Sequence, residues 1–169
     1  MGLVSSLSVA ATADLTSALD LATGTVPLQV RHAVNLSSGT GAGQADKVFS
    51  DRRTLAASAT EDLDLAGVLL DAFGAAITFA RIKGLIIKAA VGNTNNVVVG
   101  AAATNTWATL LGATHTITLR PGAALCVMAD ATDATGYAVT AGSGDLLKVA
   151  NSGAGTSVTY DIVLIGASA

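Results

Sequence analysis

Short runs in which polar and apolar residues alternate, separated by turns rich in glycine, asparagine and serine, constrain the fold of this chain most. In residues 28–36, Leu28, Val30, His32, Val34 and Leu36 fall on one side of an extended chain. A period of two predicts a strand with one buried face. Similar patterns predict strands at 48–55, 59–65, 80–87, 97–100, 116–120, 124–129, 137–140, 146–150 and 157–166. Short strands at this spacing are typical of an all-β, antiparallel β-sandwich.

The composition supports strands over helices. Hydrophobic residues make up 51% of the chain and charged residues 12%, and the only glutamate is Glu61. Exposed helix faces usually carry Glu and Lys, so a mostly helical fold is not expected. We expect one helical turn near 69–73 and a short strand or turn at 106–111. Pro121-Gly122 is predicted to join 116–120 and 124–129 as a hairpin.

The sequence divides into an N-terminal arm at 1–25 and a single sandwich domain at 26–169. The arm lacks clear alternation, yet it holds too many apolar residues for a free, solvated tail. We therefore expect the arm to lie against another copy of the chain or a larger partner. Trp107, the only tryptophan, is expected in the core or in a subunit contact. The candidate contacts to other subunits or to a partner are Leu3, Val4, Leu7, Val9, Leu15 and Trp107.

No pattern of catalytic, cofactor-binding or metal-binding residues emerges, and we expect no enzyme and no cofactor. The glycine-rich segments 39–43 and 142–145 do not open a helix, so they are interpreted as turns and not as phosphate loops. Asp62 and Asp64 alternate on a predicted strand, so both carboxylates could face one side and hold a divalent cation, although a calcium site needs more oxygen ligands. Cys126 is interpreted as a small buried residue.

The charge pattern narrows the choice of partners. The formal net charge is −3, and the nine cations are scattered, which does not fit binding to nucleic acid. The uncharged stretch 89–119 contains Asn93, Asn95, Asn96 and Asn105, whose amides would lack partners in hydrocarbon, so no membrane span is expected. So few charges indicate that much of the surface is covered in an oligomer or larger assembly.

Three segments together resemble the capsid decoration, or cement, proteins of tailed bacteriophages. They are ITFARIKGLIIKAAVGNTNNVVVG, HTITLRPGAAL and YAVTAGSGDLLKVANSGAGTSVTYDIVLIG, and the resemblance spans 63–166. It implies a jelly-roll-like sandwich located on the outer surface of the virion, where it binds the shell built by the major capsid protein. It also implies self-association, and a homotrimer is expected before a dimer because such lattices offer local three-fold and two-fold sites. The family has no catalytic residues to carry over.

Two other functions remain open from the sequence. The chain could be a different virion component, such as a tail, fibre or head-vertex protein with a binding role. A carbohydrate-binding sandwich or a β-fold hydrolase is the more remote alternative, and its only support is Trp107 together with Asp62 or Asp64.

Overall fold

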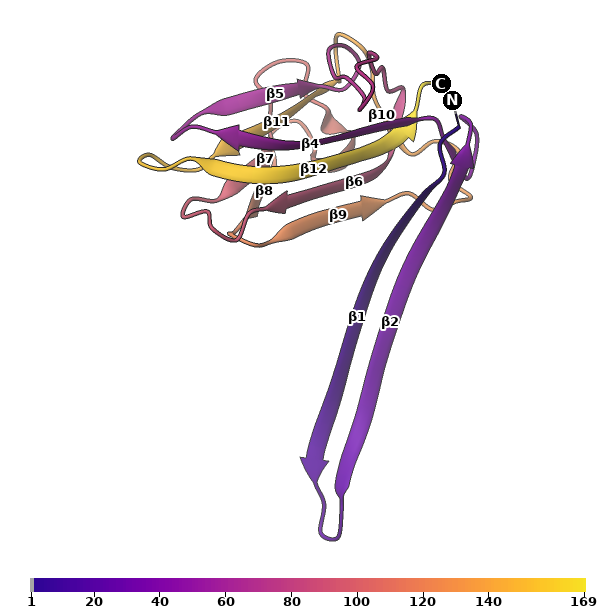
Figure 1. Cartoon of the computed structure of the whole chain (residues 1–169), viewed down its shortest axis with the longest axis vertical. Coiled ribbons are helices and arrows are strands. Elements are labelled where there is room, and N and C mark those ends of the chain that lie inside the picture. Colours follow the sequence, from indigo (N-terminus) through magenta and orange to yellow (C-terminus); the bar gives the residue numbers. More distant parts are fainter. Residues whose placement is uncertain (1) are drawn as a thin grey trace.

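The computed structural model describes residues 2–169, and it confirms the prediction of an all-β, antiparallel β-sandwich. Two sheets stack against each other, and a long hairpin projects from one end of the stack (Figure 1). The first sheet contains, in spatial order, β4 (Lys47–Leu55), β12 (Val158–Ala167) and β6 (Arg81–Ala89). Two further strands, β9 (Ala124–Met128) and β10 (Tyr137–Ala138), both pair with the outer edge of β6.

The second sheet faces the first across the core. In spatial order it consists of β5 (Thr60–Asp64), β11 (Leu146–Asn151), β7 (Val97–Gly100) and β8 (Thr116–Leu119). The helix α1 (Ala108–Leu111) lies between β7 and β8 in the chain. Within residues 2–169, no helix has the length and apolar character needed to cross a membrane.

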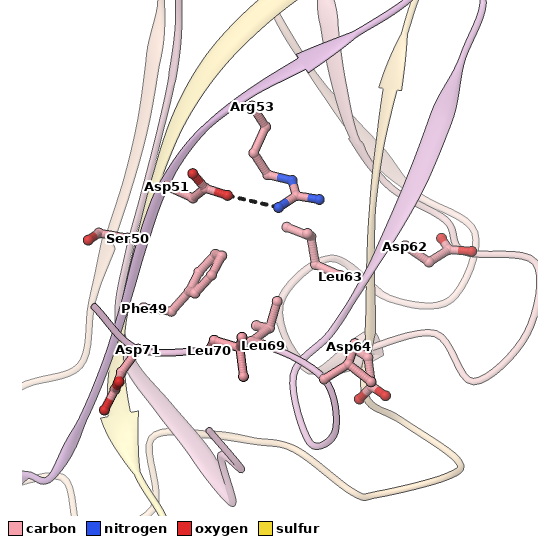
Figure 2. A pocket seen from close by; sticks show the side chains of 11 residues that line it. Phe49, Ser50, Asp51, Arg53, Asp62, Leu63, Asp64, Leu69, Leu70 and Asp71 are labelled. Atoms are coloured by element: carbon pink, nitrogen blue, oxygen red, sulfur yellow. Dashed lines mark hydrogen bonds and ion pairs between the residues drawn. The ribbon is translucent and has the colours of Figure 1, made fainter. Parts of the chain in front are cut away.

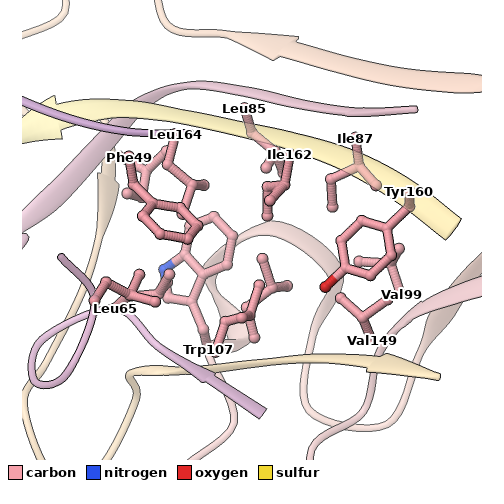
Figure 3. Close-up of a cluster of buried hydrophobic side chains, with 14 of the residues drawn as sticks. Phe49, Leu65, Leu85, Ile87, Val99, Trp107, Val149, Tyr160, Ile162 and Leu164 are labelled. Atoms are coloured by element: carbon pink, nitrogen blue, oxygen red, sulfur yellow. The ribbon is translucent and has the colours of Figure 1, made fainter. Parts of the chain in front are cut away.

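Alternate residues of the central strands fill the space between the sheets, as the period of two predicts. On β12, Val158, Tyr160, Ile162 and Leu164 are all buried, while the residues between them are only partly covered. They meet Leu85 and other buried side chains of β6, β7 and β11 in one cluster (Figure 3). The sandwich therefore has a continuous core of mainly Leu, Ile and Val.

Asparagine side chains hold the turn that joins β6 to β7. The Asn93 side chain donates to the Thr159 carbonyl oxygen at 2.9 Å and accepts from the Thr159 amide at 2.8 Å. The Asn95 amide donates to Asn151 Oδ1 at 3.0 Å and to the Gly153 carbonyl at 3.0 Å. The turn is thus tied to β12, to the end of β11 and to the segment after β11, and its asparagines have a structural role.

Three local predictions need correction. Residues 116–120 and 124–129 do not form a hairpin, because β8 pairs with β7 in one sheet and β9 pairs with β6 in the other. The Pro121-Gly122 turn instead carries the chain between sheets, with Gly122 at φ +80°, which favours glycine. No helical turn forms at 69–73, where Leu70 bridges to Ala76, and the helix α1 falls within 106–111.

The N-terminal hairpin consists of β1 (Ser5–Ala18) and β2 (Thr23–Ser38), with the short β3 (Gln44–Ala45) added at its base. The two long strands pair without interruption from Ser5 opposite Leu36 to Ala18 opposite Thr23. We expected the sandwich to begin at residue 26, but residues 26–38 pair with β1 and lie outside it. The strand predicted at 28–36 is confirmed as part of β2, but it lies in the hairpin and not in the sandwich, and its apolar face is buried only at Val34 and Leu36.

Candidate functional site

The β1–β2 hairpin has two chemically different faces, because residues directly opposite each other in the register share a face. Alternation along the strands places one set of side chains on one face and the next set on the other. The first face is mainly apolar, with Ser5 and Ser17 at its two ends: Leu7, Val9, Ala11, Ala13 and Leu15 on β1, and Val26, Leu28, Val30, His32, Val34 and Leu36 on β2. The second face carries Ser6, Ser8, Thr12, Asp14, Gln29, Arg31 and Asn35.

Only the base of the apolar face is covered by the rest of the chain. Leu7, Val34 and Leu36 are buried and form a second, smaller cluster with Ala45 and Ile165. Farther along the hairpin, Leu15 is 72% exposed and Val26 is 67% exposed. In Figure 1 this distal part extends well beyond the sandwich without touching it. A stripe of open apolar side chains therefore runs toward the tip.

Gly84 on β6 creates the space in which the hairpin base packs. A Cβ atom at this position would lie 2.6 Å from Leu7 Cδ2, so any other residue would push the leucine away. On the neighbouring strands, Gly84 is opposite Ile165 of β12 and Met128 of β9. The hairpin base thus lies on the outer face of the first sheet, over the ends of these strands.

Two cations of β6 tie the loops around the hairpin base to the sheet. Lys83 is buried, and its Nζ donates to the Gly41 carbonyl at 2.6 Å and to the Asp133 carbonyl at 3.3 Å. Arg81 donates to the Ala134 carbonyl. Burial lowers the pKa of Lys83, and the nearby charge of Arg81 adds to this effect. These cations are bound to backbone carbonyls, and the bond from Lys83 to Gly41 fixes the base of the hairpin relative to the sandwich.

A hollow of about 450 Å³ between β4, β5 and the segment 68–71 contains the carboxylates that the sequence singled out. Figure 2 shows Arg53 paired with Asp51 at one side of this hollow and Asp62 and Asp64 at the other. Asp64 Oδ1 accepts a hydrogen bond from the Ala66 amide at 3.0 Å, as in a tight turn. Among residues 2–169, no group of three or more His, Cys, Asp or Glu side chains gathers to hold a metal ion.

A second hollow, of about 520 Å³, lies beside the hairpin base. Leu3 and Val48 line it together with the segment 71–77, which includes Phe73. The Phe73 side chain is 79% exposed, so this hollow continues into open apolar surface. It contributes apolar contact area next to the hairpin and contains the charged residues Asp46, Lys47 and Asp71 at its border.

The structure separates the six predicted contact residues into three groups. Val4, Val9 and Leu15 are exposed on the hairpin or just before it, and Leu3 is half-buried at the base. Leu7 is buried against the chain's own sandwich. Trp107 is only 3% exposed and its Nε1 donates to the Ala138 carbonyl at 2.8 Å. Leu7 and Trp107 are therefore not available to another subunit, because each already packs inside this chain.

Trp107 instead belongs to the core between the sheets. Its ring meets Tyr137 edge-on, with ring centroids 6.4 Å apart. Figure 3 shows it among Phe49, Leu65 and Leu164. Since its faces are covered, Trp107 offers no platform on which a sugar could stack.

The interpretation of Cys126 as buried was wrong, because it is exposed on the outer face of β9.

Sequence analysis missed the strongest surface feature, the partnership of β1 with β2. The signal was present: apolar residues at odd positions from Leu7 to Leu15, a turn at 19–22, and then the alternation at 28–36. Because alanine occupies positions 11 and 13, the period in β1 is weak by hydrophobicity alone. Comparison with protein-family models, with curated proteins and with solved structures gives no match to this chain.

Proposed function

We propose that this chain is a capsid decoration protein, which binds the outer surface of the assembled icosahedral shell of a tailed bacteriophage through contacts with the major capsid protein. In this proposal it binds and stabilises, and it catalyses no reaction. The observation that carries the proposal is the combination of a well-packed sandwich with a long hairpin whose apolar face is open. Such a surface needs a macromolecular partner, because water solvates it poorly.

The order of the strands supports the jelly-roll-like form of the sandwich that the resemblance implies. One sheet runs β4-β12-β6-β9 and the other runs β5-β11-β7-β8. Along the chain, the strand pairs β4 and β5, β6 and β7, β8 and β9, and β11 and β12 each cross from one sheet to the other. Two Greek keys folded together have this alternation, and jelly rolls are common in virion proteins.

Binding to the shell would stabilise it by mass action. A protein that binds the assembled lattice and not its dissociated subunits shifts the assembly equilibrium by RT ln(1 + [L]/Kd) per site. At a concentration one hundred times Kd this amounts to about 2.7 kcal/mol for every occupied site. A rigid sandwich is suited to this role, because little conformational entropy is lost on binding.

The other virion roles share these features, and the position on the particle separates them. A carbohydrate-binding role loses its main support, since Trp107 is buried. The direct test mixes the purified chain with shells that lack it and measures both co-sedimentation and the temperature at which the shells break. Saturable binding with a higher breaking temperature is expected. Failure to bind intact shells, or binding that leaves their breaking temperature unchanged, would contradict the proposal.

A further inference from the structure

The outer edge of β1 is an open strand edge. β1 is 14 residues long and pairs with β2 on one side, and within residues 2–169 no strand pairs with its other side. We propose that this edge binds an extended segment of a partner protein, which adds a third strand to the hairpin. The inference deepens the proposed function, on which it rests for the identity of the partner as a protein of the shell.

Two hydrogen bonds show which backbone groups of β1 face the open edge. At the tip, the Leu19 amide donates to the Ala22 carbonyl at 2.7 Å. At the base, the Ser37 amide of β2 donates away from β1, to the Gly43 carbonyl at 2.9 Å. Because bonded and non-bonded pairs alternate along an uninterrupted antiparallel ladder, both bonds place the amides of odd-numbered β1 residues toward β2. The amides and carbonyls of the even-numbered residues in 8–18 therefore point outward and lack a strand partner.

The other long edges carry features that discourage the addition of a strand. On the outer edge of β2, Pro27 has no amide hydrogen at an outward position, and β3 occupies the base of that edge. On β4, four of the nine residues are charged. β1 contains no proline, and its one charged residue is Asp14. Its edge is therefore the long edge that is best suited to pair with another strand.

The backbone of this edge selects an extended polypeptide, and its side chains select the sequence. Side chains directly opposite each other on neighbouring strands share a face. The added strand would place small or aliphatic side chains beside the odd-numbered residues from Val9 to Leu15. On the other face it would place polar side chains, with a cation favoured opposite Asp14. His32 lies on β2, so β1 separates it from the added strand.

A third strand also accounts for the length of the hairpin. A two-stranded ribbon is marginally stable in water unless a third strand or a packed face supports it. The sandwich covers only the base, through Leu7, Val34 and Leu36, yet the pairing continues to Ala18 opposite Thr23. Main-chain hydrogen bonds to an added strand would support the uncovered part.

A labelled peptide with the sequence of residues 28–38, LQVRHAVNLSS, is the probe, because it alternates in polarity and carries one arginine. Fluorescence anisotropy should show saturable binding to the intact chain. Hydrogen exchange of the outward Ala10 and Thr12 amides should then slow, and that of the Ala11 amide, which faces β2, should not change. A control peptide with Gln29→Pro and Val34→Pro lacks a donor on each of its edges, and should bind at least about tenfold more weakly.

Ala10→Pro and Ala33→Pro are matched variants of the chain. Both alanines are exposed and have outward amides, the first on the edge of β1 and the second on the edge of β2. Ala10→Pro should weaken peptide binding by a factor of roughly 3–10, and Ala33→Pro should leave it unchanged. Exchange of the Ala11 amide reports whether the hairpin of each variant remains paired.

Three results would overturn the inference. They are the absence of saturable peptide binding to the intact chain, binding without slower exchange at Ala10 and Thr12, and equal affinities for the two paired variants. A dimer of the intact chain that Ala10→Pro abolishes would also overturn it, and would assign the edge to a second copy.

The same exchange measurement on shells separates this inference from the proposed function. Slower exchange at Ala10 and Thr12 in the shell-bound chain is expected. A chain that binds shells while these amides exchange freely would overturn the inference and leave the decoration role standing. A chain whose edge binds the peptide but that does not bind shells would overturn the decoration role and leave the strand-binding edge standing.

Discussion

Tyr160→Phe tests how strongly the core depends on one buried polar contact. Tyr160 on β12 is fully buried in the core (Figure 3). Its hydroxyl donates to Glu61 Oε1 at 2.7 Å. Arg53 donates to the other oxygen of Glu61, with Nε at 2.6 Å from Oε2. The bond connects the two sheets, because Glu61 belongs to β5. Phenylalanine keeps the ring in the core and removes only the donor.

The expected cost follows from the charge of the acceptor. A hydrogen bond to a charged group stabilises a protein by about 1.5–3 kcal/mol. Because the Glu61 side chain is 17% exposed, water can partly replace the lost donor, and we expect a loss of about 2 kcal/mol in the free energy of unfolding. For a domain of this size, that lowers the thermal midpoint by roughly 4–8 °C.

The dependence on pH gives the same contact a second signature. Burial, and then the hydrogen bond to Glu61, raise the pKa of the Tyr160 phenol above its usual 10.0. The stability that the neutral phenol contributes is therefore fully present below pH 10.0 and is lost as the pH rises toward the folded-state value. Tyr160→Phe should remove this part of the alkaline loss of stability.

Urea unfolding, followed by tryptophan fluorescence from pH 7 to alkaline pH, measures both effects. Tyr137→Phe is the control, since it leaves the bond between Tyr160 and Glu61 intact, and it should keep the alkaline loss. A double-mutant cycle with Glu61→Gln should give a coupling of about 1–2 kcal/mol. A cost below about 0.5 kcal/mol for Tyr160→Phe, or an unchanged alkaline slope, would refute this account of the core.

Three further predictions concern the hairpin and the loops at its base. Gly84→Val should displace Leu7, cost about 1–3 kcal/mol and make the hairpin more sensitive to protease, whereas Cys126→Val, at an exposed position on the neighbouring strand, should have little effect. Deletion of residues 2–38 should leave a folded sandwich with unchanged tryptophan emission, because the main core contains no hairpin residue, and should lower occupancy on shells; an unfolded chain or full occupancy would count against this. Hydrogen bonds from the backbone amides of Gly136 and Thr135 lower the pKa of Asp133 below 3.8, so the stability that this carboxylate gives its loop is present above pH 3.8 and is lost as the pH falls through the folded-state pKa. Hydrogen exchange of the Gly136 amide should accelerate over that range of pH. The variant Asp133→Asn, whose side chain cannot ionise, should not show this acceleration.

The sandwich was predictable because its strands alternate in a way that only a sheet with one buried face explains. Strands expected at 48–55, 146–150 and 157–166 appear as β4, β11 and β12 with ends shifted by no more than one residue. Pairing partners were less predictable. A turn such as Pro121-Gly122 fixes a change of direction, but a hairpin within one sheet and a crossing between sheets both satisfy it. The long-range pairing decides between them, since β8 pairs with β7 and β9 pairs with β6.

The hairpin was harder to predict for a physical reason. Alternation indicates that one face of a strand is apolar, and it does not say what covers that face. The pattern of Leu28 and Val30 is the same as that of a core strand, yet these side chains are more than half exposed in the single chain. The candidate contacts at Val9 and Leu15 lie on this face of the hairpin. Trp107 packs in the core between the sheets, and no pattern of neighbouring residues in the sequence predicts that position.

The position and copy number of the chain on intact virions test the central proposal most directly. Electron cryo-microscopy of the particle, together with quantitative mass spectrometry, gives both. We predict hundreds of copies on the outer surface of the shell. Six or twelve copies at a vertex or on the tail would contradict the decoration role, as would the absence of the chain from purified virions.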